Sequence, residues 1–416
     1  MAKIIIEGGN ELSGNITIGG AKNSAVALIP ASLLCDGEVT IDNVPNISDI
    51  DALNEILLYL GATVQRDKTT IRIDSRTIKN KSIPQKISKK LRASYYFMAA
   101  LLGKYKKVEM YFPGGCKIGA RPIDQTLKAF KALGAKIIED NNKYTITAEE
   151  LKGTTIYLDM PSVGATINTI IASCKAKGLT ILRNAAKEPE IVNVATFLNQ
   201  MGAKIRGAGT SEIKIYGVEK LDSCYTEVIP DRIEAGTYVI LGALVGNNLK
   251  IENIIPDHIK SLTSKLTEMG IPLNIDINSI TVSKSDNLKS VNVRTLGYPG
   301  FPTDLQQPLT ALLTQCVGTS SITETIYENR FQNVLYLNNM GADIKINDKQ
   351  IKITGPTPLH GEKVTATDLR AGACLILAAL KANNTTEIDE IEHVLRGYEN
   401  IVEKLRSVGA KIKIIE

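Results

Sequence analysis

Apolar residues follow two periods along this chain, and one period gives way to the other at a glycine. Before Gly61, apolar positions recur every three or four residues, which predicts an amphipathic helix. The residues of its apolar face are Ile50, Leu53, Ile56, Leu57 and Leu60. Beyond Gly61 the period becomes two, as in Ile71-Arg72-Ile73, which predicts a strand hairpin.

This order of helix, glycine and hairpin occurs repeatedly. The glycines are Gly61, Gly134, Gly202, Gly270, Gly341 and Gly409, at intervals of 68 to 73 residues. Such regularity predicts six copies of one structural unit. Each glycine fits the position after a helix end, where a left-handed residue caps the helix. The second strands of the hairpins are predicted at 71–73, 144–146, 213–215, 280–282 and 351–353.

The sixth copy has no second strand of its own before residue 416, and Ile4-Ile5-Ile6 is predicted to supply it. The copies would then form two lobes of three. One lobe is expected over residues 22–229, and the other over residues 1–21 plus 230–416, with two chain crossings between them. Because every copy combines helices with short strands, the expected fold class is mixed α and β.

The formal net charge is +5, from 49 Lys and Arg against 44 Asp and Glu. This mild excess suits small anionic substrates but is no signature of nucleic-acid binding. No apolar run reaches the length of a membrane span, so no membrane partner is expected. The six scattered cysteines fit reduced thiols in a cytoplasmic protein better than a disulfide framework.

Several common cofactor motifs are missing from the sequence. There is no HxxxH or CxxC pair, so no metal is expected. Neither GxxxxGKS/T nor a strand-linked GxGxxG occurs, which argues against the usual nucleotide-binding loops. With three histidines in the chain, proton chemistry must depend mainly on Cys, Asp, Glu, Lys or Arg.

One thiol, Cys116, lies in the glycine-rich cationic segment PGGCKIGARP at 113–122. Lys117 and Arg121 flank this thiol and would lower its pKa from about 8.5 toward neutrality. A thiol with that pKa can give or take a proton near pH 7. A surface hairpin with an incidental cysteine explains the segment equally well when it is considered alone.

A second set of polar residues precedes or opens one helix in each copy. They are Lys22-Asn23, Arg92, Ser162-Val163-Gly164, Asp231-Arg232, Asp304 and Asp368-Leu369-Arg370. Helix N-termini suit phosphate and carboxylate groups. Helix capping by Asn, Ser or Asp is an alternative interpretation for each of these residues, including Asp304, and it is the first interpretation for Ser162 and Asp231. Arg330 and Arg396 also lie just before predicted helices. Capping does not explain Lys22, Arg370 or Arg396, because cations oppose a helix N-terminus.

With these residues in place, the chain closely resembles the UDP-N-acetylglucosamine enolpyruvyl transferases (1-carboxyvinyltransferases). The resemblance covers essentially the whole length. It is carried by 22–24 (KNS), 113–122, 161–166 (PSVGAT), 187–190 (KEPE), 229–237 (IPDRIEAGT), 300–306 (GFPTDLQ), 328–331 (ENRF), 368–372 (DLRAG) and 396–399 (RGYE). The family fold is a two-lobed inside-out α/β barrel of six similar units, with the active site in the interlobe cleft.

The resemblance implies transfer of enolpyruvate from phosphoenolpyruvate to the 3′-hydroxyl of UDP-N-acetylglucosamine, with release of phosphate. The reaction is an addition followed by an elimination, through a tetrahedral ketal. It is the first committed step of peptidoglycan synthesis, and so it serves cell-wall biogenesis, cell shape and cell division. The family needs no metal or organic cofactor and is a target of fosfomycin.

The same resemblance implies roles for individual residues. Cys116 would protonate the methylene carbon of phosphoenolpyruvate, and Asp304 would be the base near the sugar hydroxyl. Lys22, Arg121 and Arg396 would hold the phosphate, whereas Arg330 and Arg370 would hold the carboxylate or lock a closed state. The residues implied for the UDP-sugar are Asn23, Arg92, Arg121, Pro122, Ile123, Asp124, Ser162, Val163, Gly164, Asp304 and Ile326. The 113–124 loop would be a lid.

The chain departs from the family at Tyr96, Thr126 and Ile167, where the family often has Trp, His and Glu. Two alternative functions stand beside the main one. A 5-enolpyruvylshikimate-3-phosphate synthase shares the fold and the donor, but its site does not use a PGGC thiol. A non-catalytic UDP-sugar-binding paralogue would be expected to lack Cys116, Asp304 or Lys22, and all three are present.

Overall fold

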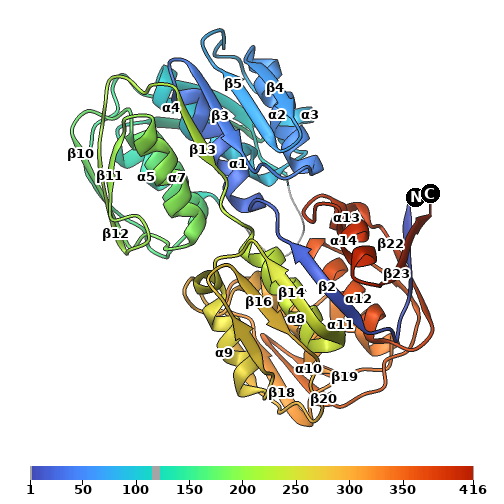
Figure 1. The fold of residues 1–416 in the computed structure, drawn as a ribbon. Coiled ribbons are helices and arrows are strands. Elements are labelled where there is room, and N and C mark those ends of the chain that lie inside the picture. Colours follow the sequence, from blue (N-terminus) through green and yellow to red (C-terminus); the bar gives the residue numbers. More distant parts are fainter. Residues whose placement is uncertain (1, 115–121, 416) are drawn as a thin grey trace. The chain divides into compact units, whose positions relative to one another are not determined.

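The computed structural model describes residues 2–114 and 122–415. The chain divides into two compact units (Figure 1). Each unit has its own hydrophobic core. The 20–229 unit contains residues 20–114 and 122–229, and the 230–415 unit contains residues 2–19 and 230–415. Cys116 and Arg121 lie outside the described residues.

The 20–229 unit contains three copies of the repeat. The first has α1 (Lys22–Ala31), η1 (Ser32–Leu34), β3 (Glu38–Asp42), α2 (Ser48–Leu60), β4 (Thr63–Asp67) and β5 (Thr70–Asp74). The second has α3 (Gln85–Ser88), η2 (Arg92–Tyr95), α4 (Tyr96–Tyr105), β6 (Lys107–Tyr111), α5 (Asp124–Ala132), β7 (Lys136–Asp140) and β8 (Lys143–Thr147). The third has β9 (Thr155–Tyr157), α6 (Val163–Ser173), β10 (Leu179–Arg183), α7 (Pro189–Gln200), β11 (Lys204–Arg206) and β12 (Glu212–Tyr216), and β13 (Cys224–Glu227) follows it.

The 230–415 unit repeats the same order. Its first copy has β2 (Leu12–Thr17), α8 (Arg232–Val245), β14 (Gly246–Glu252), η3 (Pro256–Ile259), α9 (Lys260–Glu268), β15 (Leu273–Ile275) and β16 (Ser279–Val282). The second has β17 (Asn292–Arg294), α10 (Thr303–Leu313), β18 (Gly318–Thr323), α11 (Asn333–Asn339), β19 (Asp343–Asn347) and β20 (Gln350–Gly355). The third has β21 (Lys363–Thr365), α12 (Leu369–Lys381), β22 (Thr385–Asp389), α13 (Glu392–Leu395), α14 (Ile401–Ser407), β23 (Lys411–Ile415) and β1 (Lys3–Glu7).

Each copy forms its own small sheet. Two strands do not join the unit that follows them in the chain but pair within a sheet of the other unit. β2 precedes α1 in the chain, yet it pairs in parallel with β14. β13 precedes α8, yet it pairs in parallel with β3. The strand that leads into each unit therefore belongs to a sheet of the other unit, and this exchange accounts for the two chain crossings at about residues 20 and 230.

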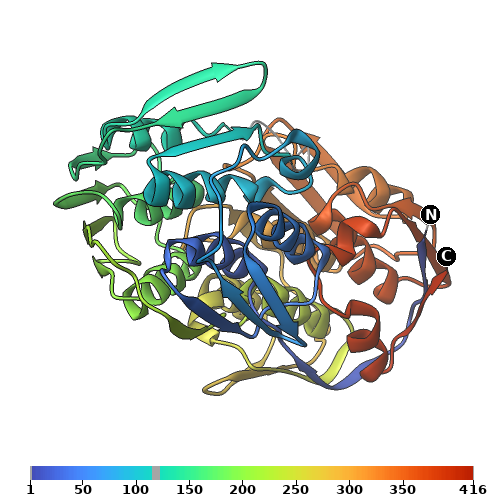
Figure 2. The same cartoon turned by 90° about the horizontal axis from the view of Figure 1, so that it is seen from above.

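The N-terminal strand completes the last copy, as the sequence predicted. In β1, Ile4 pairs with Ile388 of β22 on one side and with Ile414 of β23 on the other, in antiparallel register. Figures 1 and 2 both show β1 beside β23. Ile4 and Ile6 are fully buried, so the alternation of apolar residues in this strand serves the core.

The six repeat glycines all adopt the left-handed conformation, with φ between 89° and 104°. At the first, the Gly61 N–H donates to Leu57 O at 3.1 Å and thereby caps α2. The predicted apolar face of α2 is confirmed, since all five of its residues are fully buried. The five predicted second strands are β5, β8, β12, β16 and β20.

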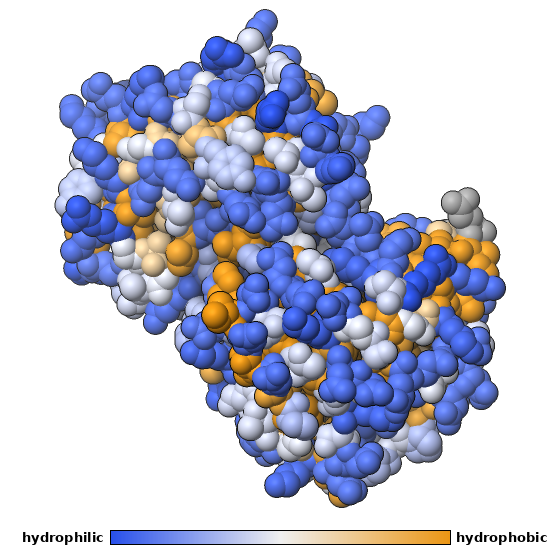
Figure 3. Space-filling view, in the orientation of Figure 1, coloured by the Kyte–Doolittle hydropathy of each residue, from blue (hydrophilic) through white to orange (hydrophobic). Residues whose placement is uncertain are grey.

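The helices that carry the candidate site at their N-termini lie within the core of each unit, which the strands and the other helices complete. In the 230–415 unit, α8, α10 and α12 pack against one another, and in the 20–229 unit α4 packs against α1 and α6. These helices are apolar on nearly every side, which fits central burial. The visible surface is largely hydrophilic (Figure 3). Among the described residues, none of the helices combines the length and apolarity needed to cross a bilayer.

Candidate functional site

Asp304, Arg330 and Arg370 form a compact charge cluster in the 230–415 unit. Arg330 Nη2 lies 2.7 Å from Asp304 Oδ1, and Arg370 Nη2 lies 3.2 Å from Asp304 Oδ2. Both arginine side chains are at most 5% exposed, whereas that of Asp304 is 26% exposed. Each carboxylate oxygen therefore has its own guanidinium, and the carboxylate remains the accessible member of the cluster.

The two arginines also set the protonation state of Asp304. Burial by itself would raise the pKa of this carboxyl, but the positive charges of Arg330 and Arg370 outweigh it and hold the pKa well below its ordinary value. Asp304 is thus ionised near neutral pH. A carboxylate paired with two cations is a weak base until one of those cations binds another anion.

The backbone and packing around Arg330 fix its position. Gln306 Nε2 and Gln307 Nε2 donate to Arg330 O at 2.9 and 3.1 Å. Asp368 caps α12 by accepting from the Arg370 and Ala371 N–H groups. These contacts with α10 and with the start of α12 therefore fix the backbone from which the two arginine side chains extend.

Arg370 has an aromatic neighbour as well. Its guanidinium carbon lies 5.3 Å from the centre of the Tyr398 ring, and the Tyr398 hydroxyl is 2.9 Å from Thr237 Oγ1 on α8. Tyr398 is almost fully buried. The aromatic face favours the cation and restricts its rotamers, so α8, α10 and α12 all contribute to this cluster.

In the 20–229 unit, Lys22 opens α1 and pairs with a buried carboxylate. Lys22 Nζ lies 2.6 Å from Asp49 Oδ2, and the Asp49 side chain is only 4% exposed. The sequence analysis did not single out Asp49, which lies in the first turn of α2. Its burial and charge explain how a lysine is tolerated at the positive end of a helix.

The remaining predicted residues of this unit lie at helix starts. Ser162 caps α6, where its Oγ accepts from Ala165 N at 3.3 Å, and Val163 and Gly164 begin the helix. Asp124 begins α5, and Asn23 is the second residue of α1. Pro122 and Ile123 precede α5, and Arg92 opens η2 with its guanidinium 5.9 Å from the Tyr95 ring centre.

Gly164 is required by its neighbour Tyr95. A Cβ on Gly164 would lie 1.5 Å from Tyr95 Oη, so any side chain here would displace the tyrosine. η2 and the start of α6, which carry the predicted Arg92 and Gly164, are therefore in contact. The structure brings these two sequence-predicted residues into one region of the unit.

The capping interpretation is correct for Ser162 and Asp231, and wrong for Asp304. Asp231 accepts from the Ile233 and Glu234 N–H groups at 2.8 and 3.0 Å. Asp304 lies one residue inside α10, whose N-cap is Pro302, and its carboxylate is directed to the arginines instead. Arg396 precedes α14, as expected, but it is also the C-cap of α13, where a cation is favourable.

The predicted thiol Cys116, like Arg121, remains a prediction because it falls in the gap between residues 114 and 122. The other cysteines are free thiols, and burial raises the pKa of Cys174 and Cys374 to about 12. High-pKa buried thiols are poor nucleophiles, which supports a purely structural role for them. The described residues contain no group of three or more His, Cys, Asp and Glu side chains arranged to hold a metal ion.

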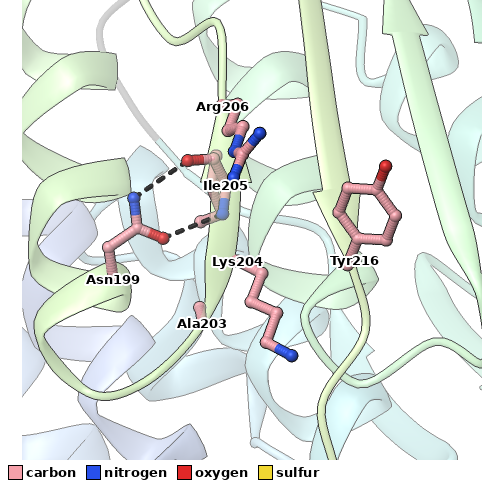
Figure 4. A pocket seen from close by; sticks show the side chains of 6 residues that line it. All are labelled: Asn199, Ala203, Lys204, Ile205, Arg206 and Tyr216. Carbon is pink, nitrogen blue, oxygen red and sulfur yellow. Dashed lines mark hydrogen bonds between the residues drawn. The ribbon is translucent and has the colours of Figure 1, made fainter.

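A surface hollow of about 510 Å³ lies on the 20–229 unit (Figure 4). It is lined by Asn199, Ala203, Lys204, Ile205, Arg206 and Tyr216. Asn199 Nδ2 donates to Ile205 O at 3.0 Å, and Ile205 N donates to Asn199 Oδ1 at 2.8 Å. The Asn199 amide therefore closes the turn between α7 and β11, and none of the predicted site residues lines the hollow.

Tyr96, Thr126 and Ile167 are all buried in the 20–229 unit. Ile167 lies on α6 and is fully buried, in a position where an ionised Glu would need a partner. Of these three side chains, only that of Ile167 is wholly apolar, whereas Tyr96 and Thr126 each bring a hydroxyl into the interior.

The fold and the two arginines gathered on Asp304 define a two-unit α/β protein with a candidate anion-binding site. The family model described as EPSP synthase (3-phosphoshikimate 1-carboxyvinyltransferase) matches residues 6–405, and the chain belongs to this family. It is 52% identical over 410 residues to a UDP-N-acetylglucosamine 1-carboxyvinyltransferase 2 of Listeria monocytogenes, covering 99% of this chain and 97% of the relative.

Solved structures agree on the fold. The enolpyruvyl transferase NikO from Streptomyces tendae is 26% identical with a TM-score of 0.91, over 99% of this chain and 98% of that one. An EPSP synthase from Acinetobacter baumannii is 20% identical with a TM-score of 0.77 over the full length of both chains. The chain therefore has the enolpyruvyl transferase fold, as its resemblance implied.

Proposed function

We propose that this protein transfers enolpyruvate from phosphoenolpyruvate to the 3′-hydroxyl of UDP-N-acetylglucosamine and releases phosphate. The observation that carries the proposal is the 52% identity, over nearly the whole chain, to a relative named for this reaction. The reaction is the first committed step of peptidoglycan synthesis, so the protein would act in the cytoplasm in cell-wall formation. The free thiols among the described cysteines suit a reducing compartment.

The proposed reaction needs one acid and one base. In the addition, a proton joins C3 of phosphoenolpyruvate, the sugar 3′-oxygen bonds to C2, and the hydroxyl proton passes to a base. In the elimination, a proton leaves C3, the bond between C2 and the phosphate oxygen breaks, and phosphate departs. We assign Cys116 as the acid and Asp304 as the base.

The charged residues would hold the donor's anionic groups. We assign Lys22, Arg121 and Arg396 to the phosphate, and Arg330 and Arg370 to the carboxylate. The burial of Arg330 and Arg370 supports this, because preorganised cations in a low-dielectric site stabilise developing charge without reorganising. The two units, over residues 22–229 and 1–21 plus 230–416, would each supply part of this set.

In the proposal, Arg330 and Arg370 have a second role, which is to control how basic the accessible carboxylate of Asp304 is. A substrate carboxylate that binds Arg330 and Arg370 would compete with Asp304 for the same donors. Loss of one cation contact raises the pKa of the carboxyl and makes it a better base. The base would therefore become effective when the donor substrate is bound.

The assay that tests the function is phosphate release from phosphoenolpyruvate by the purified protein, with and without UDP-N-acetylglucosamine. We expect release that requires the sugar nucleotide. Release that instead requires shikimate 3-phosphate would identify the shikimate-type transferase. Binding of UDP-N-acetylglucosamine without any release would support the non-catalytic paralogue.

A further inference from the structure

Glu324 is a buried carboxylate that is not among the predicted site residues, and it lies behind the charge cluster. Glu324 follows β18 and is 2% exposed. Its Oε1 accepts from Thr295 Oγ1 and from Ile326 N, both at 2.8 Å, and from Tyr327 N at 3.3 Å. Its Oε2 accepts from Thr303 Oγ1 at 2.8 Å. No role in the reaction was assigned to this residue.

Thr303 connects Glu324 to Arg330. Arg330 Nη1 donates to Thr303 Oγ1 at 3.0 Å, while the Thr303 hydroxyl donates to Glu324 Oε2. A hydroxyl has one proton and can accept at its lone pairs. Because the Thr303 hydroxyl uses its proton in the hydrogen bond to Glu324, its lone pairs face Arg330. The second terminal nitrogen of Arg330, Nη2, donates a hydrogen bond to Asp304.

We propose that Glu324 is a positioning residue: it orients the Thr303 hydroxyl so that Arg330 is held against Asp304 in the geometry that receives the substrate anion. The inference rests on the proposed function for the identity of that anion, phosphoenolpyruvate. The orientation itself follows from the donors and acceptors of the described residues alone.

An isosteric substitution separates this role from simple support of the backbone. In Glu324→Gln, three donors converge on the Oε1 position and one on the Oε2 position. The amide oxygen therefore takes the Oε1 position and keeps the turn at Ile326 and Tyr327 intact. The amide NH2 then faces Thr303, so the hydroxyl loses the acceptor that oriented its proton, and nothing at position 324 any longer keeps that proton away from Arg330 Nη1.

The expected result is specific to the donor substrate. Losing a hydrogen bond to a charged group changes binding by about tenfold to a hundredfold, so Glu324→Gln should raise the KM for phosphoenolpyruvate by that factor. The KM for UDP-N-acetylglucosamine should stay unchanged, because the turn that carries Ile326 keeps its contacts. Equal rises in both KM values would overturn the inference in favour of general loosening.

A double-mutant cycle with Thr303 tests whether Glu324 acts through that hydroxyl. Thr303→Val should reproduce the rise in KM, and Thr303→Ser, which keeps the hydroxyl, should restore the wild-type value. Adding Glu324→Gln to Thr303→Val should cause little further change. Multiplicative effects would overturn the inference. Glu268→Gln, at an exposed pair with Lys265 in the same unit, is the matched control and should leave both KM values unchanged.

A second readout does not require activity. If Glu324→Gln moves Arg330 away from Asp304, then Asp304→Asn should destabilise the Glu324→Gln protein less than it destabilises the wild type, as measured by urea unfolding. Additive effects on the free energy of unfolding would overturn the inference, whether or not the wild type releases phosphate. A wild type that releases no phosphate would separately reject the proposed function. If Glu324→Gln does not fold, the Thr303→Val and Thr303→Ser pair decides alone, and an unchanged KM in Thr303→Val would overturn the inference.

Discussion

Arg330 donates to Asp304 at 2.7 Å, so the proposed base of the reaction is held by the proposed carboxylate-binding cation. Arg370 completes the arrangement at 3.2 Å on the other oxygen. The free protein thus pairs the charges of both buried guanidinium groups with its own carboxylate, which avoids the large cost of an unpaired buried charge. The same contact links substrate binding to the basicity of Asp304.

Asp304→Asn should destabilise the protein in a pH-dependent way. At pH 7 we expect a loss of about 3–5 kcal/mol in the free energy of unfolding, because buried guanidinium charges lose their partner. Since the folded-state pKa of Asp304 is lowered, its contribution is fully present above the unfolded pKa of about 4 and is lost as the pH falls toward the folded pKa.

The difference between wild type and Asp304→Asn in urea unfolding should therefore shrink on acidification below about pH 4. Asp159→Asn is the control, because this carboxylate pairs with Lys128 at an exposed surface position. Its replacement should change the free energy of unfolding little, both at pH 7 and in acid. A difference of constant size across that range would mean that the ionised carboxylate does not supply the stability.

Asp49→Asn should weaken the binding of phosphoenolpyruvate through Lys22. The neutral amide keeps the shape of the side chain but removes the charge that holds Lys22 Nζ at 2.6 Å. We expect the KM for phosphoenolpyruvate to rise by about tenfold, as for one charge-assisted hydrogen bond. Steady-state kinetics measures it, with Asp51→Asn on the exposed side of α2 as the control. An unchanged KM would separate Lys22 from phosphate binding.

Cys116 should be alkylated by the epoxide fosfomycin when UDP-N-acetylglucosamine is present. The thiolate attacks a ring carbon, the carbon–oxygen bond of the ring breaks, and the oxygen takes up a proton. Intact-mass analysis should detect one adduct, and Cys116→Ser should show none. Cys116→Asp should keep some activity, since a carboxylic acid can still donate a proton. An unmodified wild-type protein would count against an activated thiol.

Gly202→Ala should cost about 1–2 kcal/mol of stability from backbone strain alone. Gly202 has φ of +104°, and no atom lies within 4 Å of the position that an alanine Cβ would take, so no steric contact adds to the strain. Gly202→Asn should cost less, because asparagine tolerates the left-handed region. Thermal or urea unfolding compares the two variants. Equal stability of Gly202→Ala and wild type would show that this glycine is not needed to end α7.

The periodicity of the chain was enough to predict the repeats. The apolar face of α2, the left-handed glycines and the hairpin strands all follow from local rules, since a helix end and a strand alternation depend on neighbours in sequence. The use of the 4–6 strand by the sixth copy also followed, because this strand has the pattern that the copy lacked, whereas its register, with Ile4 opposite Ile414, came from the structure.

Fewer details of the candidate site could be predicted from the sequence. The motifs identified Asp304, Arg330 and Arg370, but a helix-capping role for Asp304 was as consistent with its position as an ion pair. Asp49 and Glu324 carried no signal, because a single acidic residue in an amphipathic segment resembles any exposed one until its burial is known.

The sequence by itself determined the six copies, their helix and strand order and the residue types at each helix start, because these depend on local propensity and period. Only the tertiary structure decided that β2 and β13 exchange sheets, and that Asp304 faces two arginines with Thr303 and Glu324 behind one of them. Such relationships join residues far apart in the chain. They are set by packing and by the need to pair every buried charge, which no local pattern records.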